Sequence, residues 1–119
     1  MPEFVATFAR LARLAPPGSW PAVLPTTPEA SKRPRPLSLG IGARVAALLP
    51  EAERAALHDA IGLYTRSAYY LEALAADEAR RWSDDGARAL EPVSPEHRRT
   101  AAAVLLARAA RKLAKGARG

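Results

Sequence analysis

Cysteine is absent from this sequence of 119 residues, which excludes disulfides, thiolate metal sites and a cysteine nucleophile. Histidine occurs only at His58 and His97, too few for a histidine-rich zinc site. No run of about 18 apolar residues occurs, so we expect no membrane-spanning segment. Pro2, Glu3 and Arg10 interrupt the N-terminal residues, which argues against a secretory signal. We therefore expect a cytoplasmic protein that binds no metal and no cofactor.

Aromatic residues are also few, at 6% of the chain, whereas alanine accounts for 28 residues. The hydrophobic fraction of 49% and the charged fraction of 25% are ordinary for a globular domain. The length suffices for one domain and is short for two. We therefore expect one thin, mostly helical core built from Leu, Ile, Val, Ala and a few rings.

Acidic residues are missing from one end of the chain, although the whole sequence carries a net charge of +6. Residues 98–119 hold seven basic and no acidic residues, or +7. Residues 41–97 hold six basic and ten acidic residues, or −4, and residues 1–40 hold five and two, or +3. Basic ends around a mixed-charge middle are expected of a protein with a polyanionic partner such as a nucleic acid.

Apolar residues at helical spacing predict a first helix over about 3–14. Residues 16–36 then hold seven of the eleven prolines and predict an irregular arm. Trp20, Val23 and Leu24 are the apolar residues available to hold this arm against the domain. Loops of this length are often functional or mobile.

The middle of the chain predicts three further helices. After an extended stretch at 37–41, helical spacing continues up to Leu49. Pro50 is then suited to the first turn of the next helix. Either Thr65 or Ser67 can cap the helix that follows.

The last third of the sequence predicts a hairpin and a long helix. The Asp85-Gly86 pair is a strong turn signal, and we expect strands at 80–82 and 87–89 around it. Ser94 caps the last helix, which we expect over about 95–115.

Four short motifs occur in order along the chain. They are Arg35-Pro36-Leu37-Ser38-Leu39-Gly40-Ile41, Leu63-Tyr64-Thr65 followed by Ser67 and Tyr70-Leu71, the Asp85-Gly86 hairpin, and Val93-Ser94-Pro95-Glu96-His97. We expect two short helices between the first two motifs. In this order of motifs, the sequence resembles the ProQ/FinO family of bacterial RNA-binding proteins over about residues 35–112. The chain resembles a minimal, single-domain member of that family.

The resemblance implies a compact, mostly helical α+β domain of about five helices with a small β-hairpin. It also implies an RNA chaperone in post-transcriptional regulation. Such proteins recognise double-stranded stems with a single-stranded 3′ end, as in terminators of small RNAs and messenger RNAs, and the RNA 3′ end meets a helix N-terminus. We expect a monomer in which residues 1–36 form a helix and a proline-rich arm, residues 37–115 the RNA-binding domain, and residues 116–119 a basic tail.

The resemblance and the neighbouring charges together indicate the RNA-binding residues. They are Lys32, Arg33, Arg35, Arg54, His58, Thr65, Arg66, Ser67, Tyr70, Arg80 and Arg81. The Thr65 and Ser67 hydroxyls are placed to contact the RNA 3′ end, and Tyr70 to donate a hydrogen bond or stack on a base. Either Arg80 or Arg81 corresponds to the family's hairpin arginine.

Several positions depart from the family pattern. Ser38, His58 and Gly62 stand where basic residues are common in the family. The central face is therefore poorer in charge, and we expect the cations of the proline-rich arm and of the C-terminal end to compensate.

Two other functions are consistent with the residues alone. The proline-rich arm at 16–36 suits a docking segment of a protein–protein adaptor. The basic ends also suit a general DNA-binding or polyanion-binding protein. We do not expect an enzyme, a membrane partner or a small-molecule substrate, because no nucleophile–base pair or phosphate loop occurs. Asp84 and Asp85 are better explained by a turn than by a metal.

Overall fold

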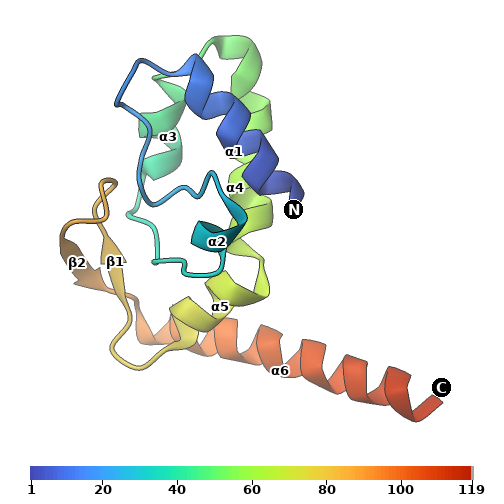
Figure 1. Cartoon of the computed structure of the whole chain (residues 1–119). Helices are drawn as coiled ribbons and strands as arrows, with labels where there is room; N and C mark the ends of the chain where they lie inside the picture. Colours follow the sequence, from blue (N-terminus) through green and yellow to red (C-terminus); the bar gives the residue numbers. More distant parts are fainter. Residues whose placement is uncertain (119) are drawn as a thin grey trace.

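The computed structural model describes residues 1–118. Within them it contains six α-helices and a two-stranded sheet (Figure 1). The mostly helical α+β class expected from the sequence is confirmed. The first helix, α1 (Glu3–Leu14), has the predicted bounds and buries Phe4, Val5 and Phe8 on its apolar face. This face packs against α4 (Arg54–Thr65), so the N-terminal helix shares the core of the rest of the domain.

Tyr64, near the end of α4, occupies the centre of the core and is 1% exposed. Its ring centroid lies 5.3 Å from that of Phe4 and 6.0 Å from that of Phe8, both on α1. On its other side Tyr70, from α5 (Ala68–Ala75), lies 5.1 Å away. Four of the seven aromatic residues are therefore gathered where three helices meet.

The proline-rich arm connects α1 to α3 (Ile41–Ala46), and its apolar residues pack into the core (Figure 1). Val23 and Leu24 are buried, and the Trp20 indole N–H donates a hydrogen bond to the Leu24 carbonyl at 3.1 Å. The anchoring predicted for these residues is confirmed. The arm also contains a one-turn helix, α2 (Pro28–Ser31), capped by Thr27. Four residues are too few to show a helical period, so the sequence did not predict it.

The helix α3 (Ile41–Ala46) begins after Gly40, whose φ of 80° lies in the left-handed region that favours glycine. It ends three residues before the predicted end at Leu49. The chain tightens there into turns with i→i+3 hydrogen bonds, because the N–H groups of Leu48 and Leu49 donate to the Val45 and Ala46 carbonyls. Pro50 then disfavours the helical conformation of the residue before it. Pro50 leads into a short 3-10 helix, η1 (Glu51–Glu53), and α4 follows.

The hairpin forms at the predicted place, but its second strand was predicted too early. The strands are β1 (Arg80–Trp82) and β2 (Ala89–Pro92), rather than a second strand at 87–89. Ser83 closes a wider loop than a two-residue turn, because its N–H donates to the Arg88 carbonyl and its hydroxyl accepts from the Arg88 N–H. The expected Asp85-Gly86 turn lies inside this loop, with Gly86 at a φ of 71°.

The last helix, α6 (Pro95–Arg118), begins where predicted, because the Ser94 hydroxyl accepts the His97 N–H at 3.1 Å. Its first part packs on α5 through Ala101, Val104 and Leu105. The helix runs past residue 115 and projects from the domain (Figure 1). Within residues 1–118, no helix is both long and apolar enough to cross a membrane.

The division of the chain at residues 36 and 115 stays a prediction. Gly119, the last residue of the expected basic tail, lies outside the described residues.

Candidate functional site

A pocket of about 380 Å³ opens where segment 37–42, α5, β1 and α6 meet. The segment supplies one wall, and Thr65 at the end of α4 adds to it. Tyr70 and two leucines of α5 form the floor, and His97 to Val104 of α6 close the other side. The volume lies in the usual range for ligand-binding pockets.

Arg81 is the only Lys or Arg among the residues that line this pocket, and no carboxylate lines it. The guanidinium donates to the Leu37 carbonyl at 2.8 Å, and its other terminal nitrogen lies 3.1 Å from Nδ1 of His97. An arginine has five N–H donors, so most of them stay available to a ligand. The permanent charge of the pocket is therefore positive, which favours an anionic group.

Tyr70 fixes the segment from the other side. Its side chain is 3% exposed, and its hydroxyl oxygen accepts the Leu37 N–H at 2.8 Å. Burial raises the pKa of this hydroxyl, so it keeps its proton. No residue within 1–118 accepts that proton, which leaves it to donate to a ligand in the pocket. The ring packs against Tyr64, so the expected stacking on a base would require the ring to leave the core.

The structure decides between Thr65 and Ser67, either of which the sequence offered as the cap of the next helix. Ser67 is the N-cap of α5, and its hydroxyl accepts the Tyr70 N–H. Thr65 is the last residue of α4, where its hydroxyl donates back to the Ile61 carbonyl at 2.9 Å. Only Thr65 lines the pocket, and its oxygen can still accept a hydrogen bond there.

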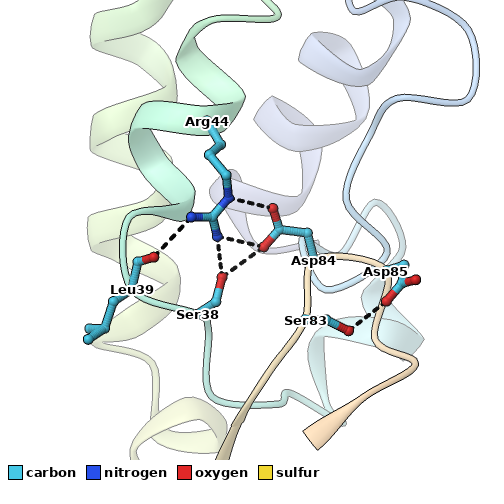
Figure 2. Close-up of polar contacts among 6 residues, drawn as sticks. All are labelled: Ser38, Leu39, Arg44, Ser83, Asp84 and Asp85. Atoms are coloured by element: carbon cyan, nitrogen blue, oxygen red, sulfur yellow. Dashed lines mark hydrogen bonds and ion pairs between the residues drawn. The ribbon is translucent and has the colours of Figure 1, made fainter. Parts of the chain in front are cut away.

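A network of side chains ties segment 37–42 to the hairpin loop (Figure 2). Arg44 of α3 pairs with Asp84 through two hydrogen bonds of 2.9 Å and donates to the Leu39 carbonyl. Ser38, which is buried, donates to the same Asp84 carboxylate at 2.8 Å and accepts from Arg44. The hydrogen bonds from Arg44 hold the pKa of Asp84 below its usual value, so the carboxylate stays ionised. The network keeps one wall of the pocket in place.

Asp85 closes the hairpin loop, as its neighbours in the sequence suggest. Its carboxylate accepts from the Ser83 hydroxyl at 2.6 Å and from the Ala87 N–H at 3.0 Å. Among residues 1–118, no group of three or more His, Cys, Asp and Glu side chains is placed to hold a metal ion.

The cations of the proline-rich arm lie outside the pocket. Lys32, Arg33 and Arg35 are all exposed. Arg35 stacks over the Trp82 ring, 4.3 Å from its centroid, and donates to the Gly86 carbonyl. These contacts hold the arm against the hairpin loop, with part of the Arg35 charge left open to solvent.

The expected residues of α4 form a separate surface. Arg54, His58 and Arg66 are exposed and do not line the pocket. The Arg54 guanidinium donates to the Ala46 carbonyl at 3.1 Å and so joins the start of α4 to the end of α3.

The structure separates the two hairpin arginines that the sequence left undecided. Arg81 points to the pocket, whereas Arg80 is exposed and donates to the Leu90 carbonyl across the hairpin. Of the expected residues, the pocket thus brings together Thr65, Tyr70 and Arg81.

Sequence reasoning missed His97, which is not among the RNA-binding residues expected from the sequence. The structure places its ring beside Arg81 at the pocket, with Thr100 one turn further along α6. The helical spacing of 97, 100, 101 and 104 was the available signal. What the sequence did not show is that this face of α6 turns toward segment 37–42.

The protein is therefore a small helical domain with a positively charged pocket that no Asp or Glu lines. A domain of this class is suited to an anionic ligand. The model of the ProQ/FINO family matches residues 12–118, and the chain belongs to that family. The ProQ/FinO family is a family of RNA-binding proteins and RNA chaperones. No curated protein and no solved structure gives a significant match to the chain.

Proposed function

We propose that the protein binds structured RNA and holds the single-stranded 3′ end of that RNA in the pocket beside Arg81. The observation that carries the proposal is the pocket lining, which combines one permanent cation with several hydroxyl groups and lacks a carboxylate. Membership of an RNA-binding family supplies the class of ligand.

The chemistry of a terminal nucleotide fits these groups. The free N–H donors of Arg81 suit the phosphate that joins the last nucleotide to the strand, because an arginine can bind phosphate with two parallel hydrogen bonds. Tyr70 can donate to a ribose hydroxyl, and Thr65 can accept from one. The double-stranded stem would then be recognised outside the pocket by its shape and backbone, as A-form duplexes usually are.

The biological role that follows is that of an RNA chaperone in post-transcriptional regulation. The RNA partners would be small RNAs and messenger RNA 3′ ends that finish in a hairpin and a short tail. We expect a monomer in the bacterial cytoplasm, with no catalytic step.

The proposal is tested with four nucleic acids, of which the duplex DNA matches the tailed hairpin in length. They are a GC-rich RNA hairpin with a 3′ oligo-U tail, the same hairpin without the tail, the tailed hairpin with a 3′ phosphate, and duplex DNA. We expect the tailed hairpin to bind best. Losing the tail, or replacing the terminal hydroxyl by a bulkier phosphate, should weaken binding about tenfold, the effect of one or two lost hydrogen bonds.

The measurement is the equilibrium dissociation constant of each complex at one fixed salt concentration, because affinities for nucleic acids depend steeply on salt. Equal affinity for all four would contradict the proposal and favour general polyanion binding. No binding to any of them would favour the adaptor function.

A further inference from the structure

We propose that the basic face of α6 is a track for the RNA phosphate backbone that continues directly from the pocket. This inference rests on the proposed function, and it adds a second surface and a direction for the bound strand. The surface belongs to the projecting part of α6, residues 106–117, which we term the α6 arm.

The α6 arm has no packing partner within residues 1–118. Every residue from 106 to 117 is exposed, and Leu106 and Leu113 are 72% and 76% exposed. The side chains of α6 that pack against the core end at Leu105. The arm therefore does not stabilise the domain by burial, and its charges are available to a ligand.

The four cations of the arm project from one side of the helix. At 3.6 residues per turn, Arg108, Arg111, Lys112 and Lys115 all lie within about 60° of the direction of His97. Four of the five residues that line a shallow hollow on the arm are these cations, which shows that the side chains gather there. The opposite side carries Leu106, Ala110, Leu113 and Ala117.

The side of α6 that carries these four cations is also the side that faces the pocket. Ala101 and Val104 line the pocket and lie within about 40° of His97 around the helix axis. The pocket wall and the basic face are thus one continuous stripe. From Thr100 to Lys115 the stripe is about 22 Å long at 1.5 Å per residue. A strand with duplex-like stacking covers this length with about six phosphates at roughly 3.4 Å each.

The charges of the stripe have no ion-pair partner among residues 1–118. Residues 98–119 contain no acid, and the two ion pairs found within residues 1–118 both lie elsewhere. Like charges three or four residues apart on a helix repel one another, so the bare stripe destabilises its own helix. An anionic strand along it would remove this repulsion. A second copy of the arm would add four more positive charges, which argues against a dimer through this face.

The test compares the wild type with two variants of the full chain. The first variant removes the four cations, with Arg108→Ala, Arg111→Ala, Lys112→Ala and Lys115→Ala. The second adds to these changes four cations on the opposite side, with Leu106→Lys, Ala110→Lys, Leu113→Lys and Ala117→Lys. The second variant therefore has the wild-type net charge in the wrong place. Alanine and lysine both favour helix, so circular dichroism should show the arm intact.

We expect the four-alanine variant to bind the tailed RNA hairpin at least tenfold more weakly than the wild type. The plot of log K against log salt should also become less steep, its slope falling in magnitude by about 3 because four phosphate contacts are lost. The opposite-face variant should not recover the affinity. A short oligo-U strand that fills only the pocket should bind both variants as it binds the wild type. The ratio of affinities for 3′-hydroxyl and 3′-phosphate RNA should not change.

Wild-type affinity and salt slope in the four-alanine variant would overturn the track. Full recovery in the opposite-face variant would also overturn it, by showing that net charge alone matters. If the four-alanine variant bound RNA as the wild type does but no longer bound anionic vesicles, the basic face would be assigned to a membrane instead. The pocket is judged separately, because the proposed function fails if the wild type itself shows no preference for a free 3′ end.

Discussion

Replacing Tyr64 by alanine is expected to lower the free energy of unfolding by about 3–5 kcal/mol, the usual cost of deleting a large buried ring. Tyr64 is 1% exposed and its ring touches the aromatic side chains of Phe4, Phe8 and Tyr70. The variant would lose packing between α1, α4 and α5 at once. Domains of this size are stable by only about 5–15 kcal/mol, so the variant loses a large fraction of the total stability.

The measurement is urea denaturation followed by circular dichroism at constant temperature and pH. Tyr69→Ala is the matched control, because Tyr69 is a neighbouring tyrosine of which 49% is exposed. We expect the control to change the free energy of unfolding by less than about 0.5 kcal/mol. Similar values for the two variants would show that Tyr64 is not the centre of the core.

Replacing Arg81 by alanine is expected to weaken binding of the tailed RNA hairpin between about tenfold and a hundredfold. Hydrogen bonds to a charged group contribute about 1.5–3 kcal/mol, and Arg81 is the only Lys or Arg in the pocket lining. Arg80→Ala is the matched control, since it removes the same charge one residue away and outside the pocket. The control should lose about threefold or less, through long-range attraction alone.

Arg81 also donates to the Leu37 carbonyl, so its removal has a structural effect that must be measured separately. Arg81→Lys addresses this point, because lysine keeps the charge but not the paired donors of a guanidinium. We expect this variant to fold normally and still bind weakly. Equal losses for the Arg80 and Arg81 variants would contradict a specific role for the pocket.

The helices could be predicted where local chemistry decides the outcome. The bounds of α1 follow from its apolar spacing, and α6 begins at the Ser94 cap. Local signals did not decide the structure where two of them compete, and they did not reveal very short elements such as α2. Thr65 and Ser67 are equally good caps in the sequence, but only Ser67 has the extended backbone of an N-cap in the structure. The Asp85-Gly86 signal was correct as a turn, although a hydrogen-bonded loop around it delays the second strand.

The pocket could be predicted only in part, because packing between distant segments creates it. Thr65, Tyr70 and Arg81 were expected from the family motifs, but His97 was not. Its role depends on how α6 packs on α5, which apolar spacing does not specify. The network of Ser38, Arg44 and Asp84 likewise joins residues about 40 positions apart. Net charge was the least informative guide to the position of the pocket, because most of the lining residues belong to segment 41–97, which carries a charge of −4.

The position of the RNA 3′ end on the protein is the central claim, and crosslinking tests it most directly. A tailed RNA hairpin with a photoreactive uridine as its last nucleotide and a free 3′ hydroxyl would be crosslinked to the wild-type chain, and the modified peptides identified by mass spectrometry. We predict crosslinks to segment 37–42 and to the first turns of α6, from His97 to Val104. Crosslinks concentrated on α1, on the exposed side of α4 or on the α6 arm would contradict the account.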